Sequence, residues 1–167
     1  IDPSPAAVAV AFERKIPVRL GTLEDLESPK EHYAAITMFY VLEHLPDPMG
    51  ALRKAFDLLA PGGRLLVRVP HTTPIVRMLS PFGLGASLYD APFHLYDFSP
   101  SILQDMLRKA GFTDTCTYPG RSTRPSRLGP LAASFLFGAL ARGRYSFSGG
   151  RFLLPGVSKT TIARKPL

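Results

Sequence analysis

The sequence has few of the features that mark secreted or membrane-spanning proteins. Cys116 is its single cysteine, so no internal disulfide can form, and this favours a reducing compartment. No apolar run approaches the ~20 residues that cross a bilayer. No basic-then-apolar signal segment opens the chain. These absences predict a cytoplasmic location.

Signatures of metal and nucleic-acid binding are also missing. No cysteines and histidines stand at the spacing of a zinc site, so the sequence predicts no metal. The net charge is +7, and the basic residues concentrate in the last third of the chain. Without a nucleic-acid fold signature, this excess predicts a solubilising or loosely anion-seeking surface rather than specific nucleic-acid binding.

The clearest pattern that is present lies in the first half of the chain. Two short apolar runs, Ala34–Met38 and Leu65–Val69, flank a segment with apolar residues at helical spacing. Asp47 suits the N-cap of that helix, and Pro-Gly-Gly at 61–63 predicts its end. The order strand, helix, strand predicts a parallel pair in an open α/β sheet. Such sheets bind ligands beyond the carboxyl ends of their strands.

Three segments carry a resemblance to a known family: VLEHLPDP (41–48), LLAPGGRLLVRVP (58–70) and HLYDFSPSILQDMLRKAGF (94–112). Together they resemble the class I S-adenosylmethionine-dependent methyltransferases, in the branch that includes the ubiquinone-biosynthesis type. The resemblance implies a Rossmann-like α/β sheet, mostly parallel with an antiparallel last strand. It also implies S-adenosyl-L-methionine as cofactor and methyl transfer to a small-molecule acceptor.

The resemblance implies five cofactor-binding residues. Asp2 matches the acidic residue that takes the ribose hydroxyls, because a carboxylate can accept two vicinal O–H donors. Thr22 and Leu23 match the adenine-side loop, with Thr22 where an aspartate is usual. Phe39 and Tyr40 fall beside the methionine portion. Two structural alternatives stay open: Asp2 or Ser4 caps the helix Pro5–Arg14, and the Thr22–Leu23 segment is an ordinary turn.

The catalytic and acceptor-side residues also follow from the resemblance. It places His44 near the transferred methyl group, where an imidazole can act as general base. The alternative is that His44 only orders its loop through hydrogen bonds. His94 and Tyr96 border the acceptor site of the family, although a structural corner explains them equally well.

One part of the family pattern has no counterpart. The family's first strand and glycine-rich loop precede the acidic residue, and nothing in this chain supplies them. We therefore expect one N-terminally incomplete domain over residues 1–167, lacking its first βα unit. The alternative to an enzyme is a non-catalytic methyltransferase-like remnant that serves interaction or dimerisation. A related nucleotide-dependent enzyme, such as a dehydrogenase, is a third hypothesis.

Two insertions are expected within this domain. Residues 71–97 predict a lid or acceptor-side insertion, since long irregular connections are often functional. Residues 121–156 form a basic and apolar insertion with a helix near Leu131–Leu140. A helix apolar all round favours burial or a homodimer contact over a peripheral membrane contact. Ser158–Ala163 predicts the closing strand.

Overall fold

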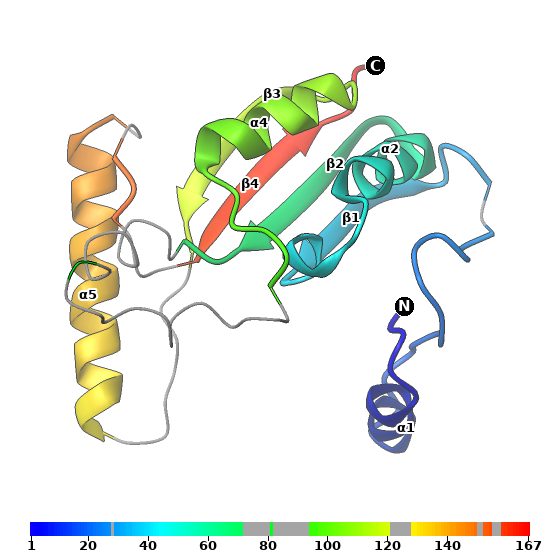
Figure 1. Cartoon of the computed structure of the whole chain (residues 1–167), viewed down its shortest axis with the longest axis horizontal. Coiled ribbons are helices and arrows are strands. Elements are labelled where there is room, and N and C mark those ends of the chain that lie inside the picture. Colours follow the sequence, from blue (N-terminus) through cyan, green and yellow to red (C-terminus); the bar gives the residue numbers. More distant parts are fainter. Residues whose placement is uncertain (28, 72–80, 82–93, 121–127, 150–151, 155–157) are drawn as a thin grey trace.

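A computed structural model gives the fold of the chain (Figure 1). It describes residues 1–27, 29–71, 81, 94–120, 128–149, 152–154 and 158–167, with the backbone alone at 128–134 and 137. The described elements are α1 (Pro5–Glu13), β1 (Tyr33–Phe39), the 3-10 helix η1 (Leu42–His44), α2 (Pro48–Leu58), β2 (Leu59–Val69), α4 (Pro100–Lys109), β3 (Thr113–Pro119), α5 (Leu128–Phe147) and β4 (Lys159–Arg164).

The four strands form one sheet in the order β1-β2-β4-β3. β1 and β2 are parallel, with Met38 opposite Val67. β4 is antiparallel to both of its neighbours, β2 and β3. Three strands therefore run in one direction and the last strand runs against them, as the sequence predicted. The parallel β1–α2–β2 crossover is likewise confirmed.

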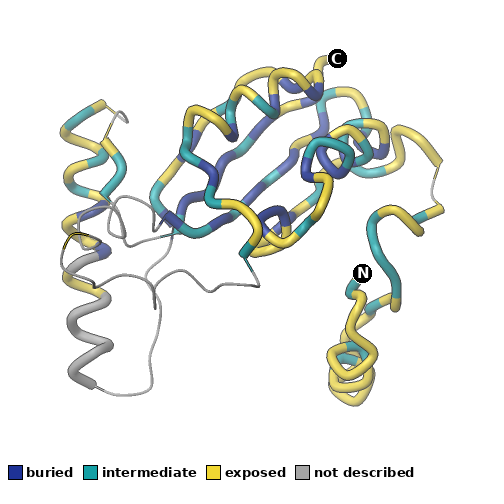
Figure 2. Tube along the Cα trace, viewed as in Figure 1, coloured by how far each residue is buried: buried dark blue, intermediate teal, exposed yellow. Residues whose placement is uncertain are grey.

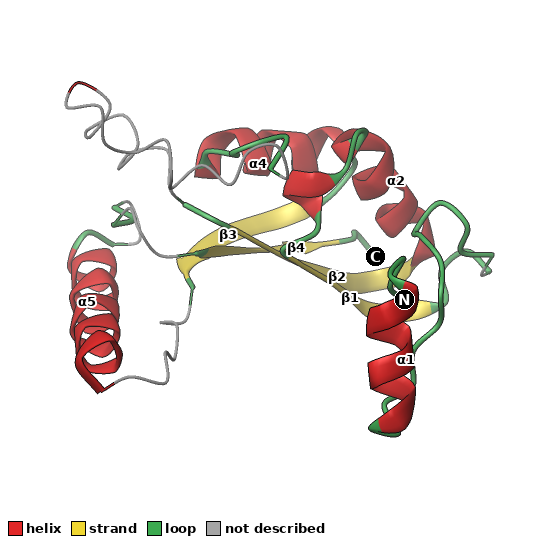
Figure 3. Cartoon of the chain, turned by 60° about the horizontal axis from the view of Figure 1, so that its bottom comes forward, coloured by secondary structure: helices red, strands yellow, loops and turns green. Residues whose placement is uncertain are grey.

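α2 and α4 cover one face of this sheet (Figure 3). Asp47 caps α2 by accepting a hydrogen bond from Gly50 N, and Ser99 caps α4 in the same way through Ile102 N. The two helices and the strands bury a shared apolar core that includes Leu52, Ala55, Leu65, Val67, Leu103, Leu107 and Ala163. Each fully buried leucine stabilises the fold by about 1.5–3 kcal/mol. The core thus fixes the helices over the sheet and leaves the strand ends for a site.

The predicted end of α2 at the Pro-Gly-Gly sequence is wrong. α2 ends at Leu58, and β2 already begins at Leu59. Gly62 has φ +75° and donates its N–H to Lys165 O, which ties the start of β2 to the carboxyl-terminal tail. A Cβ on Gly63 would lie 2.7 Å from Ala60 O. The glycines therefore serve a close backbone approach inside an extended strand rather than a helix stop.

Gly111, just after α4, gives a test of this packing. Its φ is +104°, and a Cβ there would lie 2.9 Å from Cε2 of Phe56. We expect Gly111→Ala to lower the free energy of unfolding by about 1–3 kcal/mol, measured by urea denaturation. Gly143→Ala in α5, where no atom lies within 4 Å of the added methyl group, is the matched control and should not destabilise. Equal stability of the two variants would contradict the close packing.

The amino-terminal segment lies beyond β1, apart from the sheet (Figures 1 and 3). α1 has no buried residue. A single parallel bridge joins Asp2 to Leu20 in this segment. Among the described strands, β1 pairs only with β2, so its other side carries no described strand.

The two predicted insertions fall largely outside the described residues. Of 71–97, the structure describes His71, residue 81 and 94–97. Of 121–156, it describes α5, residues 148–149 and 152–154. Of the α5 residues whose burial is described, Gly138 and Ala141 alone are buried, so the chain itself leaves most of this part of the helix uncovered (Figure 2). The alternative of a homodimer contact stays a prediction.

Candidate active site

A sharp corner follows the carboxyl end of β1. Tyr40 has φ +57°, a left-handed conformation that is uncommon for a residue with a side chain, and its N–H donates to Arg68 O at 2.8 Å. The turn leaves the side chains of Phe39 and Tyr40 exposed. The Arg68 guanidinium lies 4.7 Å from the centroid of the Phe39 ring. Backbone strain at such a place is typical of a binding corner.

Glu43, in η1 after this corner, has a buried carboxylate. Its exposed fraction is 1%, and neither carboxylate oxygen accepts a hydrogen bond from another described residue. Burial raises the pKa of Glu43, although its own backbone N–H and then the charges of His44, His94 and Lys159 act to lower it. Oε1 of Glu43 lies 4.0 Å from Nε2 of His44. An unsatisfied buried carboxylate of this kind indicates a functional site rather than a packing role.

A backbone clamp brings the segment after residue 93 to this corner. Glu43 O accepts hydrogen bonds from Leu95 N at 2.9 Å and from Tyr96 N at 3.3 Å. The Tyr96 hydroxyl donates to Pro46 O at 3.2 Å. As a result the His44 and His94 rings lie 4.8 Å apart, centroid to centroid. The structure therefore unites three of the predicted site residues, His44, His94 and Tyr96.

Glu43, His44 and His94 are also the described residues that could hold a metal ion. Their ligand atoms all lie within 4.8 Å of one another. Two imidazoles and a carboxylate form a donor set that suits a divalent transition metal. Sequence spacing did not indicate this group, because the chain between His44 and His94 is too long for a recognisable ligand motif.

Lys159, at the start of β4, is a site residue that the sequence did not reveal. Its fully buried Nζ donates to Pro70 O at 2.6 Å and lies 3.8 Å from Oδ1 of Asp97. Burial lowers the pKa of Lys159 to about 8, because the loss of hydration outweighs the attraction of Asp97 and Glu43. From the sequence, a lysine at the end of a strand is expected to be exposed to solvent, so no sequence pattern predicted that Lys159 is buried.

His71, which follows β2, is buried. Its Nδ1 lies 3.4 Å from Nζ of Lys159. Burial, and then the charge of Lys159, lower the pKa of His71. The neutral ring therefore suits this position beside a buried cation.

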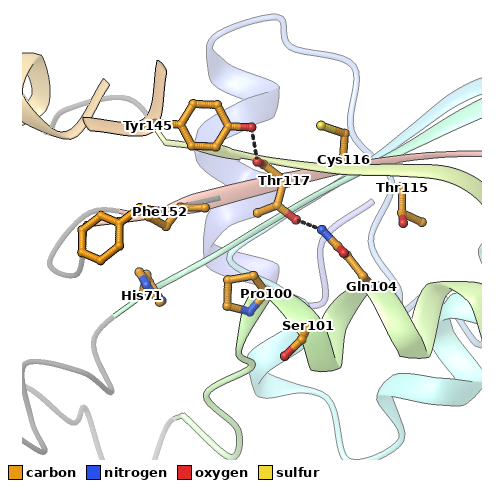
Figure 4. Close-up of a pocket in the computed structure, with 10 residues that line it drawn as sticks. His71, Pro100, Ser101, Gln104, Thr115, Cys116, Thr117, Tyr145 and Phe152 are labelled. Atoms are coloured by element: carbon orange, nitrogen blue, oxygen red, sulfur yellow. Dashed lines mark hydrogen bonds between the residues drawn. The ribbon is translucent and has the colours of Figure 1, made fainter. Parts of the chain in front are cut away.

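His71 also lines a pocket of about 470 Å³ between α4, β3 and α5 (Figure 4). The Thr117 hydroxyl accepts from Nε2 of Gln104 at 2.9 Å, and the Tyr145 hydroxyl donates to Thr117 O at 2.7 Å. The other lining residues are Pro100, Ser101, Thr115, Cys116, Phe152 and Leu153. None of the predicted site residues lines this pocket. Lys159 joins it, through His71, to the segment that carries Asp97.

The predicted cofactor residues near the amino terminus form local turns. Oδ1 of Asp2 accepts from Ser4 N at 2.8 Å, while Ser4 caps α1. The Thr22 hydroxyl donates to Oδ2 of Asp25 at 2.7 Å, and this bond lowers the pKa of Asp25. Leu23 packs against the core. The local geometry of Thr22 and Leu23 is therefore that of a turn, which is the structural alternative named above. Their role in binding a cofactor stays a prediction.

The buried Glu43 carboxylate gives a prediction for stability. Because burial raises its pKa, the folded state loses stability as pH rises from about 4.5 through the folded value. Glu43→Gln removes this charge, so we expect the variant to be more stable than the parent at pH 7 by on the order of 1 kcal/mol. The difference should shrink at pH 4.5. Urea denaturation at both pH values checks this, with the exposed Glu24→Gln as control.

Comparisons with known proteins agree with this geometry. The profile of the methyltransferase domain family matches residues 1–117. The ubiquinone biosynthesis O-methyltransferase of Xanthomonas axonopodis pv. citri is 34% identical over 122 residues, which cover 66% of this chain and 51% of that protein. The enzyme of the same name from Marinobacter nauticus is 31% identical over 104 residues, covering 58% and 44%. The chain thus spans about half the length of these curated relatives.

A solved structure shares the fold across nearly the whole chain. A SAM-dependent methyltransferase from Thermotoga maritima, described as a possible histamine N-methyltransferase, is similar with a TM-score of 0.65 and 22% identity. The similarity covers 98% of this chain and 70% of that one. The Rossmann-like methyltransferase sheet predicted from the sequence is therefore confirmed. By its matching family profile and its fold, the chain belongs to the class I S-adenosylmethionine-dependent methyltransferases, in the branch that includes the ubiquinone-biosynthesis enzymes.

Proposed function

We propose that this chain serves S-adenosylmethionine-dependent methyl transfer to a hydroxyl group of a small-molecule acceptor. The observation that carries the proposal is the group of Glu43, His44 and His94 at the carboxyl end of β1. Parallel sheets place their ligands at this end. The O-methyltransferase relatives favour oxygen as the acceptor atom.

A hydroxyl acceptor must lose its proton as the methyl group arrives, and His44 is placed to take it. The Glu43 carboxylate, 4.0 Å from Nε2 of His44, stabilises the imidazolium that forms. Because Glu43 is buried, water screens this attraction little. His94, in ring contact with His44, would border the acceptor, with Tyr96 holding the segment in place.

S-adenosylmethionine supplies an electrophilic methyl group on a sulfonium, and the residues present fit it in part. The Asp2 backbone is hydrogen-bonded to Arg19 and Gly21, and its carboxylate would accept the ribose hydroxyls. Exposed Phe39 and Tyr40 offer an apolar wall for the methionine portion. The Thr22 hydroxyl is engaged by Asp25, so the adenine contact would fall mainly on Leu23.

Two measurements test the proposal. Calorimetric titration with S-adenosylhomocysteine should show binding, weakened about tenfold in Asp2→Asn by the loss of a charged acceptor. Transfer of labelled methyl groups should favour catechols over matched amines and thiols. Binding without transfer to any hydroxyl acceptor would contradict the proposed reaction.

The second candidate function is a non-catalytic interaction domain. It draws support from β1, which pairs with a described strand on one side only. An open strand edge can pair with another chain. The same titration separates the two functions, because an absence of binding together with a stable dimer in light scattering would favour the interaction domain.

A further inference from the structure

The outward side of α5 carries an apolar stripe. Leu136, Leu140 and Phe147 are 66%, 55% and 95% exposed. They stand at positions i, i+4 and i+11, which share one side of a helix with 3.6 residues per turn. Figure 2 shows this part of α5 as exposed. These side chains therefore form a narrow apolar surface in contact with water.

The opposite side of α5 is the one that docks on the protein. Gly138 and Ala141 are buried, and the Tyr145 hydroxyl donates to Thr117 O of β3. These three stand at i, i+3 and i+7, about half a turn away from the stripe. The stripe thus points away from the sheet because of how the helix is docked, and the described part of the protein does not cover it.

The charge around α5 has one sign. After Asp114 the sequence contains no aspartate or glutamate, although it contains many arginines and lysines. Arg142 and Arg144 are both exposed; Arg144 borders the stripe, whereas Arg142 lies closer to the docked side of the helix. Arg144 also stacks over the Phe152 ring at 5.1 Å. In the sequence, further arginines precede and follow the helix: Arg121, Arg124, Arg127 and Arg151. An apolar stripe on a helix whose charged residues are all arginines is complementary to a surface that is apolar within and anionic at its edge.

We propose that α5 lies on the surface of an anionic lipid membrane. Leu136, Leu140 and Phe147 would enter the acyl-chain boundary, while Arg142 and Arg144 meet the lipid phosphates. No helix in the described part of the chain is long and apolar enough to cross a bilayer, so α5 would lie along the surface. With three apolar side chains and two described arginines, the attachment is weak, reversible and sensitive to salt.

This attachment would orient the rest of the molecule. α5 follows the carboxyl end of β3 and precedes the start of β4, so it is joined to the same end of the sheet as His71 and Lys159. Tyr145, on the docked side of α5, lines the pocket next to His71. The membrane would therefore lie near the pocket end of the sheet.

Flotation of the full chain with lipid vesicles tests the proposal. Vesicles of phosphatidylcholine with phosphatidylglycerol should bind the protein at least about tenfold better than phosphatidylcholine alone, and high salt should release it. Two variants should each lower the binding about tenfold or more: the triple variant Leu136→Gln, Leu140→Gln, Phe147→Gln and the double variant Arg142→Gln, Arg144→Gln. These side chains are exposed, so circular dichroism should show an unchanged fold.

The matched control is Phe12→Gln, which removes an aromatic ring that is 81% exposed on α1. It should bind vesicles as the parent does. Equal binding by the parent and the triple variant would overturn the proposal. So would a dimer of the parent that the triple variant dissolves, because the stripe would then face a second copy. Tighter retention on a nucleic acid than on anionic vesicles would overturn it as well.

Discussion

Between about pH 8 and pH 9.5, the free energy of unfolding should increase by about 1.5 kcal/mol through Lys159 alone. The folded-state pKa of Lys159 is about 8, below the ordinary value of a lysine. In this range the unfolded chain binds a proton at this side chain that the folded chain has released. Stability therefore rises with pH, and the destabilisation present below pH 8 disappears as the unfolded lysine also loses its proton.

The groups around Lys159 fix the window for this measurement. Asp97 and Glu43 both favour its charged form, but they act less strongly than the loss of hydration. His71 is on the other side, and its own pKa is lowered, so it stays neutral throughout this range. The pKa of Tyr145 is raised by burial, so this tyrosine opposes the trend only above about pH 10. A limit near pH 9.5 avoids that contribution.

Chemical denaturation at several pH values checks the prediction. Lys159→Met, of similar shape without the charge, should lose this pH dependence. Lys30→Met removes a lysine that is 79% exposed and should keep it. An equal slope in Lys159→Met and the parent would contradict the assignment. If Lys159→Met does not fold, Asp97→Asn replaces it, because loss of that carboxylate should move the rise in stability to lower pH.

His44→Gln should lower kcat/KM for a hydroxyl acceptor by roughly 10²–10⁴-fold, the contribution of a general base. Glutamine keeps a polar side chain beside Glu43 but cannot take up the proton. The loss should appear mainly in kcat, because His44 is not among the residues predicted to bind the cofactor. Single-turnover transfer of a labelled methyl group measures it.

The matched control for this experiment is His32→Gln, next to β1 and packed edge-on against Tyr33. It should leave the rate unchanged. Affinity for S-adenosylhomocysteine should be the same in His44→Gln and in the parent. A His44→Gln variant with full activity would show that His44 only orders its loop, which is the alternative that the sequence leaves open.

Local sequence patterns predicted the helices and strands in which apolar residues recur at regular spacing. The apolar stripe and N-cap of α2 and the two apolar runs beside it indicated the crossover, because helix and strand periods are local properties. The Pro-Gly-Gly sequence led to a wrong prediction for the end of α2. Gly62 and Gly63 form backbone hydrogen bonds with Lys165, which is distant in sequence. The composition of α5 does not reveal which of its sides docks on the protein, so the exposed side could not be predicted.

Only the residues of the candidate site that lie within the family motifs could be predicted from the sequence. His44 and His94 could be named from motifs, but their ring contact depends on the Glu43 O clamp between distant segments. The burial of Glu43 and of Lys159 depends on tertiary packing, so the neighbouring residues in the sequence do not predict it. Charged residues inside a fold are rare, and sequence alone therefore assigns them to the surface.

The position of β4 has a consequence for synthesis of the chain. β4 follows the other described strands in the sequence, yet it lies between β2 and β3 and is the only described strand that joins them. Until residues 159–164 leave the ribosome, β3 has no described strand to pair with and one side of β2 stays open. A premature stop before Lys159 would release two unjoined pieces of sheet with exposed edges, a species prone to aggregate.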